Sequence, residues 1–392
     1  MIPDIFRRNS KKSQLTLLLL LTFIILTSCG GNVNNGNEIS HIRITNDGES
    51  HIGFNAVVNG KSFHTTEDDI IAEINNLPSD YRNEPFHKKL WRYLIKSRYF
   101  FAPYTGDTWG HSPVLYLNSI GFGLCDDVTS VYYALASRFG HKTRVWDLYG
   151  PDFKSGHVVP EVLIEDRWEM YDPSMEVYYW NENDQVAGVE ELYSSPHLIT
   201  RPINPFPVTH FSASALTSDP PPTPYAYTQR VANVYSSGHH RIEPLYHHQA
   251  DVPKYDHPFS LPPKAYLEFP AEIDHTLKSA LGTDVPSYNL MRLVLPKGWS
   301  GSVKLPLVFV TISGSGSISL NEAVYNLDSP EIAKRMIIKK YKPKYIYQVS
   351  VNESLSDIEI LFLVNKTRFD LDNISSFEIK GADSNMLSVV YN

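Results

Sequence analysis

The chain has 392 residues, of which 42% are hydrophobic and 20% charged, so it can bury a core and is not a disordered chain. Its length predicts about two domains. The formal net charge is −8, and because residues 1–28 carry +3, the remainder carries −11. An acidic body without basic runs argues against a nucleic-acid partner, and two cysteines are too few for a disulfide scaffold or a cysteine-rich zinc site.

The N-terminus has the layout of an export signal. Basic residues between Arg7 and Lys12 precede the apolar run Leu15–Leu26, which is shorter than the about 17–25 residues of a membrane-spanning helix. The run ends in Leu-Thr-Ser-Cys-Gly around Cys29, which resembles the lipobox of bacterial lipoproteins. This resemblance implies a signal peptide over 1–28 and lipidation of Cys29, which would anchor the chain to a bilayer. The alternative is a plain signal peptide in which the cysteine is incidental.

The segment after the signal is small and polar, and it predicts a flexible tether over residues 29–40. The lipobox resemblance implies an exported, membrane-anchored lipoprotein. Gly30 favours the outer membrane or the cell surface, because an aspartate at this position retains lipoproteins in the inner membrane of some bacteria.

Residues 41–193 show the periodicities of a first domain with helices and strands. The pattern predicts a short strand region and then three helices: one that Thr66 and Asp69 cap, one that begins at Asn83 and Pro85, and one over 126–139 that Gly140 ends. Beyond these helices the period changes, and strands are expected at 144–148, 157–164 and 167–172. The polar pair Glu165-Asp166 has the length of a tight hairpin turn between the last two strands.

The second half of the chain differs in composition. Residues 194–263 hold 13 of the 27 prolines and 7 of the 15 histidines, which predicts an ordered but irregular connector. From 264 to 392 short β-rich runs recur and predict an antiparallel β-sandwich of immunoglobulin-like type, with runs at 288–295, 304–313, 336–341, 346–351, 358–364, 376–380 and 387–391 and one short helix near 330–334.

Cys125 stands directly before the third predicted helix, where backbone N–H groups have no intrahelical partner. A cysteine nucleophile acts as its thiolate, which a helix N-terminus and a neighbouring imidazolium both favour. The backbone N–H at this position is also suited to hold an oxyanion. Because the acidic pair Asp126-Asp127 disfavours a thiolate, the site requires a histidine partner.

The predicted hairpin supplies that partner. If Ile164 pairs with Arg167, the register places Val159 opposite Asp172. His157 then lies on the same face as Asp172 and diagonal to it, within side-chain reach. A carboxylate there would hold one imidazole nitrogen and present the other to a thiol.

These residues together resemble the transglutaminase-like superfamily. The resemblance covers about residues 109–180 and rests on Gly-Leu-Cys125 opening a helix, on His157-Val-Val-Pro-Glu-Val, and on Arg-Trp-Glu-Met-Tyr-Asp172-Pro. It implies an α+β protein with a papain-like core domain followed by the C-terminal β-sandwich. It further implies Cys125 as the nucleophile, His157 as general base and then acid, and Asp172 as the orienting carboxylate.

Two features depart from the superfamily pattern. Members often carry an aromatic residue shortly after the histidine, where this chain has Val158-Val159-Pro160. The second oxyanion donor of the superfamily lies upstream of the cysteine and has no fixed motif. Its candidates here are Trp109, His111 and Asn118.

The resemblance implies acyl transfer from amides by a cysteine-dependent enzyme without a cofactor, with hydrolysis favoured over cross-linking. The substrate would be a peptide, a protein or another amide-bearing molecule of the cell envelope. Two alternatives stay open. One is a catalytically inactive binding or scaffolding lipoprotein. The other is a metal-dependent hydrolase built on the histidine pairs at 239–240 and 247–248, which no cysteine or ordered acidic spacing supports.

Overall fold

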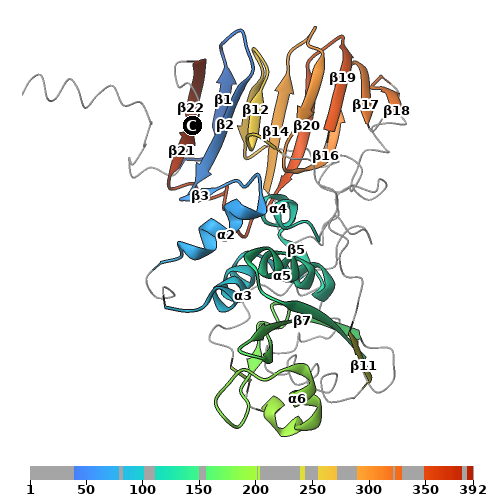
Figure 1. Ribbon diagram of the computed structural model, residues 1–392. Coiled ribbons are helices and arrows are strands. Elements are labelled where there is room, and N and C mark those ends of the chain that lie inside the picture. The colour runs from blue at the N-terminus through green and yellow to red at the C-terminus, as the bar shows by residue number, and fades with distance from the viewer. Residues whose placement is uncertain are drawn as a thin grey trace, which may run out of the picture.

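The computed structural model describes residues 39–78, 83–100, 111–149, 156–200, 202–203, 239–242, 255–271, 289–320, 323–328, 348–381 and 386–391. Figure 1 shows strands gathered in one half of the molecule, a layer of helices beside them, and a smaller sheet beyond the helices. The chain is α+β, and its sheets are antiparallel except where β4 (Tyr99–Phe100) pairs with β5 (Phe122–Gly123). No helix within the described ranges is long and apolar enough to cross a membrane.

The larger half is a two-layered β-sandwich. One layer is a six-stranded sheet in the order β16-β20-β14-β13-β1-β22, and the other comprises the sheets β12-β2-β21, with β3 attached to β2, and β15-β19-β17-β18. The strands are β1 (Ile42–Asn46), β2 (Ile52–Val58), β3 (Lys61–Ser62), β12 (Phe259–Leu261), β13 (Tyr266–Phe269), β14 (Asn289–Leu295), β15 (Gly301–Lys304), β16 (Val308–Ser313), β17 (Gly316–Leu320), β18 (Ala323–Asn326), β19 (Gln348–Ser354), β20 (Ile358–Val364), β21 (Phe377–Lys380) and β22 (Leu387–Tyr391).

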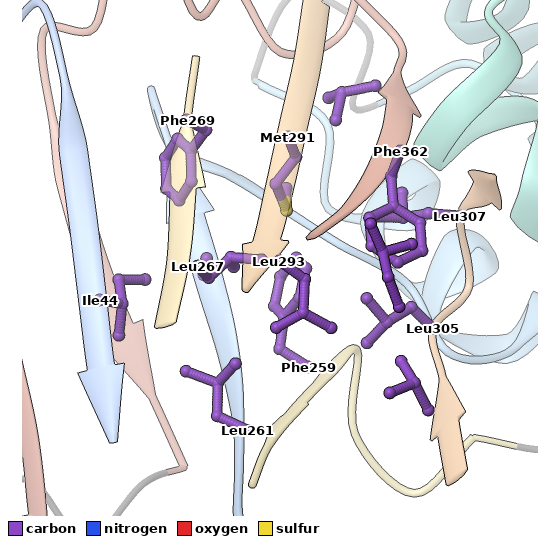
Figure 2. Close-up of a cluster of buried hydrophobic side chains, with 14 of the residues drawn as sticks. Ile44, Phe259, Leu261, Leu267, Phe269, Met291, Leu293, Leu305, Leu307 and Phe362 are labelled. Carbon is purple, nitrogen blue, oxygen red and sulfur yellow. The ribbon is translucent and has the colours of Figure 1, made fainter. Parts of the chain in front are cut away.

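A single hydrophobic core fills the space between the two layers. Figure 2 shows Leu267, Met291 and Phe362 of the six-stranded sheet packed together with Phe259 and Leu261 of the opposite layer. All five side chains are buried, so each removes most of its apolar surface from water. An antiparallel sandwich is therefore present, as the strand periodicity predicts.

The sandwich takes in residues that the sequence pattern groups elsewhere. β1 pairs with β13 and β22, and β2 pairs with β12 and β21. Residues 42–62, which the pattern groups with the first domain, thus complete the C-terminal sheets, and β12 comes from the proline-rich connector. Arg43 and Glu268 show the separation involved, since they pair across 225 residues. Alternating hydrophobicity identifies a strand but does not identify its partner.

The helical layer forms largely where the sequence places it. Thr66 and Asp69 make a full capping box, and Gly140 ends the last long helix in the left-handed conformation, so both predictions are confirmed. The second helix begins later than predicted, because Pro85 rather than Asn83 is its N-cap. The helices are α2 (Glu67–Asn75), α3 (Phe86–Lys96), α4 (Pro113–Leu115), the π-helix η4 (Tyr116–Ile120), α5 (Cys125–Phe139), α6 (Val189–Ser194) and the 3-10 helix η5 (Pro196–Thr200).

The smaller sheet carries the predicted hairpin. Its order is β11-β6-β7-β8, formed by β11 (His239–Ile242), β6 (Thr143–Tyr149), β7 (Gly156–Ile164) and β8 (Arg167–Met170); β9 (Tyr178–Tyr179) and β10 (Pro202–Ile203) form a separate pair. Ile164 pairs with Arg167, which confirms the predicted register. Glu165 and Asp166 both have positive φ, 46° and 65°, as a two-residue hairpin turn requires.

The helices pack against the outer face of the six-stranded sheet. In β20 the side chains of Ile360 and Phe362 point into the sandwich core, whereas those of Leu361 and Leu363 join a second core with α2, α3, η4 and α5. A strand buried on both faces reads as a continuous apolar run, as residues 360–364 do. The two halves therefore share one interface rather than being joined only by a linker.

Candidate functional site

The site begins at the first turn of α5. Leu124 is the N-cap residue and has no side-chain acceptor, so the Asp127 carboxylate reaches back and accepts the Leu124 N–H at 2.9 Å. Gly123 makes room for this cap, because a Cβ added there would lie 2.6 Å from the Asp127 Cβ. Cys125 is consequently the first residue of the helix, with its backbone N–H among those that lack an intrahelical partner, and its free thiol is half-buried.

His157 reaches the same place from β7. Its side chain is buried, and its Nε2 lies 2.6 Å from Oδ2 of Asp172, which is fully buried. The Cys125 thiol also acts on this imidazole, and its hydrogen bonding and charge contribute to raising the pKa of His157. Since Nε2 is engaged by the carboxylate, Nδ1 is the ring nitrogen left for the thiol. The three residues that the sequence singled out are thus brought together in the order cysteine, histidine, aspartate.

The electrostatics of the group favour a charged imidazole. Burial by itself would lower the pKa of His157, but the Asp172 carboxylate, through its charge and its hydrogen bond, outweighs that effect with a smaller contribution from Cys125. Together these effects raise the pKa of His157 to about 10. An imidazolium held this strongly next to a thiol is the partner that a thiolate requires.

Asp172 is fixed from several sides. Its Oδ1 accepts the backbone N–H groups of Ser174 and Met175, both at 2.8 Å, which leaves Oδ2 for His157. Its backbone carbonyl accepts a hydrogen bond from Trp91 Nε1 at 2.9 Å. These bonds fix the position and orientation of the carboxylate before any substrate arrives, and such preorganisation is what an orienting group needs.

Arg98 supports the turn that follows Asp172. Its guanidinium is buried and donates to the carbonyls of Pro173 and Ser174, and it lies 3.6 Å from the Glu176 carboxylate. Burial raises the pKa of Glu176 to about 7, against the opposing effect of Arg98. Sequence reasoning missed Trp91, which lies on α3, and Arg98, which follows its C-cap. No local pattern distinguishes an arginine that buries its charge from one that reaches solvent, or a core indole from one that donates to a distant carbonyl.

Acidic residues surround the start of α5. Burial, together with the neighbouring Asp126 carboxylate, raises the pKa of Asp127 to about 7, so its protonated and ionised forms are both populated near neutral pH. His111 Nε2 lies 3.8 Å from Asp127 Oδ1. In the part of the chain that the structure describes, His111, Asp126 and Asp127 are the one group with atoms close enough together to hold a metal, and Asp127 is already engaged by the helix cap and by His111.

The prediction that Asn118 donates to an oxyanion is wrong. Its Nδ2 donates to the carbonyls of His64 at 2.7 Å and Pro306 at 3.3 Å, and its Oδ1 accepts the His64 N–H. Both amide hydrogens therefore bridge η4 to the sandwich and are not directed at the thiol. His111 instead lies beside the first turn of α5.

Some candidates lie where the structure gives no description. Trp109, Cys29 with its preceding apolar run, and the histidine pair at 247–248 fall outside the described residues. The pair His239-His240 lies on β11, at the edge of the smaller sheet beside β6.

Two hollows in the described part of the chain lie away from the thiol. The larger, of about 640 Å³, is bordered by the β2–β3 hairpin and α2, and the smaller, of about 260 Å³, lies against α3. Both share Lys61 and Glu73 in their walls. Arg368 and Lys61 both pair with Glu73, so much of the charge at this boundary is compensated within the protein.

A comparison with protein-family models found no match, and comparisons with curated proteins and with solved structures found none either.

Proposed function

We propose that the chain is an envelope-anchored lipoprotein whose transglutaminase-like, papain-like core cleaves amides by acyl transfer through Cys125. The observation that carries this proposal is the connected group of Cys125, His157 and Asp172. Cys125 opens α5, His157 lies on β7 and Asp172 follows β8. His157 thereby has the thiol on one side and the orienting carboxylate on the other, as a general base needs.

The chemistry follows from the positions of these groups. The Cys125 thiolate adds to the amide carbonyl carbon and forms a C–S bond, while the backbone N–H of Cys125 stabilises the oxyanion. The imidazolium of His157 then gives its proton to the leaving nitrogen as the C–N bond breaks. A free amine departs, and the acyl group stays on sulfur as a thioester.

Water resolves the thioester. His157, now neutral, takes a proton from the water as its oxygen attacks the acyl carbon, and the C–S bond breaks to release a carboxylic acid and the thiolate. The balanced reaction is an amide plus water giving an acid and an amine. His111 is the second oxyanion donor that we favour, since its ring lies beside the first turn of α5.

The location is part of the proposal. The basic start, the apolar run Leu15–Leu26 and Cys29 in its lipobox context support export and lipidation. Two or three buried acyl chains, at ~0.8 kcal/mol per CH₂, would hold the protein stably at a bilayer. The substrate would then be a peptide or protein amide of the cell envelope.

The pH dependence of Cys125 alkylation tests the proposal. In protein lacking residues 1–29, Cys125 is the only thiol, so its reaction with iodoacetamide reports on this residue alone. We expect fast alkylation down to about pH 6 that His157→Ala abolishes, because the imidazolium stabilises the thiolate. Alkylation that instead follows an ordinary thiol of pKa about 8.5, with or without His157, would refute the proposal and leave a non-catalytic binding lipoprotein.

A further inference from the structure

Asn365 in the sandwich is hydrogen-bonded to two segments that flank the candidate site. It directly follows β20 and is buried, with 1% of its surface exposed. Its Nδ2 donates to the carbonyl of Ser97 and to the carbonyl of Leu117, both at 3.0 Å. Its Oδ1 accepts the backbone N–H groups of Thr367 at 3.0 Å and Arg368 at 3.3 Å, so the amide has both its donors and its acceptor engaged.

The first of these carbonyls belongs to the segment that supports Asp172. Ser97 is the C-cap residue of α3, and Arg98 follows it directly. Arg98 donates to the carbonyls of the turn after Asp172, as described above. The Ser97 carbonyl is therefore connected to the carboxylate through the guanidinium of Arg98 and through Ser174, whose N–H donates to Asp172 Oδ1.

The second carbonyl belongs to the segment that leads into the nucleophile. Leu117 lies in η4, which ends at Ile120, and Cys125 opens α5 five residues later. The same segment is held by Ser119, whose hydroxyl donates to the Leu363 carbonyl and accepts the Val308 N–H at 2.9 Å. The sandwich strands β16 and β20 thus bind, through the Ser119 hydroxyl, the segment that leads into Cys125.

Gly121 shows how closely this contact is fitted. It has a φ of 64°, and a Cβ added to it would lie 2.1 Å from Asn365 Oδ1. The backbone before Cys125 therefore touches the Asn365 amide directly, and any larger residue at this position displaces one or the other.

We infer that Asn365 is a positioning residue for the site, and that the β-sandwich is a structural part of the catalytic unit rather than a separate module. The inference rests on the proposed function. One side-chain amide fixes the segment before Cys125 and the segment beside Asp172 to the same point of a rigid sheet. It thereby sets the separation between the thiol and the His157–Asp172 pair.

Asn365→Ala tests the inference against a matched control. Asn46 has a similar bonding pattern inside the sandwich, where its Nδ2 donates to two carbonyls, those of Ser50 and Leu261, and its Oδ1 accepts one N–H group, that of Gly48. Asn46 is fully buried as well, so Asn46→Ala removes an equivalent amide away from the site. Both variants should lower the urea midpoint by a similar amount.

The measurement is the pH profile of Cys125 alkylation in the folded variants. A misplacement of reacting groups by about 1 Å costs up to about 100-fold in rate. We therefore expect Asn365→Ala to slow alkylation at about pH 6 by about 10- to 100-fold, towards the His157→Ala profile, while Asn46→Ala stays within about twofold of wild type. Equal profiles for the two variants would overturn the inference. A wild-type profile independent of His157 would overturn the proposed function and the positioning role together.

A second pair of variants covers the case in which Asn365→Ala does not fold. Gly121→Ala pushes against the amide, whereas Gly140→Ala carries a comparable left-handed strain, with a φ of 107°, in open space. We expect only Gly121→Ala to slow alkylation at about pH 6, by about tenfold or more. Equal rates in the two glycine variants would contradict the role assigned to Asn365.

Discussion

Replacing Arg98 by methionine should destabilise the protein more at neutral than at acidic pH. The guanidinium is almost fully buried, donates to the carbonyls of Pro173 and Ser174, and lies 3.6 Å from Glu176, whose side chain is 3% exposed. Methionine keeps much of the side-chain volume but leaves a buried carboxylate without its cation. Breaking a buried ion pair from one side costs about 3–5 kcal/mol.

The pH dependence follows from Glu176. Its pKa of about 7 in the folded protein lies above the ordinary 4.5, so the folded state binds this proton more tightly and stability falls as pH rises from 4.5 to about 7. At 1.36 kcal/mol per pKa unit, this difference amounts to about 3 kcal/mol in the wild type. Without Arg98 the carboxyl holds its proton to still higher pH, so the stability of the variant continues to fall where that of the wild type has levelled off.

Urea unfolding of wild type and Arg98→Met at two pH values checks this reasoning. At about pH 5 Glu176 is protonated in both folded proteins, and only the lost hydrogen bonds to the two carbonyls remain, at about 1–3 kcal/mol. At about pH 8 the full 3–5 kcal/mol should appear. The double variant Arg98→Met/Glu176→Gln lacks the titrating carboxyl. The cost of replacing Arg98 should therefore differ much less between the two pH values in the double variant than in Arg98→Met alone. A cost that is equal at both pH values, or below about 1 kcal/mol at both, would refute the account.

Three further outcomes are expected. His157→Gln should lower the free energy of unfolding most at about pH 6 and least near pH 10. A histidine whose pKa is raised in the folded state contributes stability that is complete below about pH 6.5 and is lost as the pH rises through the folded-state pKa of about 10. Urea midpoints across this pH range measure the effect. Glu161→Ala should cost about 3–5 kcal/mol, since this buried carboxylate binds Arg144, whereas Glu190→Ala, which removes an exposed partner of the same arginine, should cost below about 1 kcal/mol in the same assay. Removing residues 264–392 should leave a chain that lacks cooperative thermal unfolding by circular dichroism, because the strands that cover its helices are gone.

The local parts of the site were predictable because each depends on residues close together in the sequence. The Thr66 capping box and the Glu165-Asp166 turn are signalled within four residues. The hairpin register then placed His157 near Asp172. The ladder itself stops at Met170, but Asp172 Oδ2 still lies 2.6 Å from Nε2 of His157.

What could not be predicted depends on contacts between distant segments. Asn118 is a polar side chain shortly before a cysteine, and in the sequence that makes it a reasonable oxyanion donor. In the fold its amide donates to the backbone carbonyls of His64 and Pro306, which lie 54 residues before it and 188 residues after it. Likewise, no local pattern reveals that Arg98 is buried under the turn at Pro173.

Contacts between distant segments also explain why the sequence pattern predicts a domain boundary that the structure does not have. Composition changes sharply at the proline-rich segment, and such a change usually marks a boundary between domains. Here the strands on either side of that segment pair with each other, and β20 contributes Ile360 to the sandwich core and Leu361 to the helical core. A strand buried on both faces cannot be released from one side without exposing apolar surface on the other. The sandwich and the candidate site therefore have to fold as one unit. A substitution in the sheet can then change the position of the Cys125 thiol without contacting that side chain.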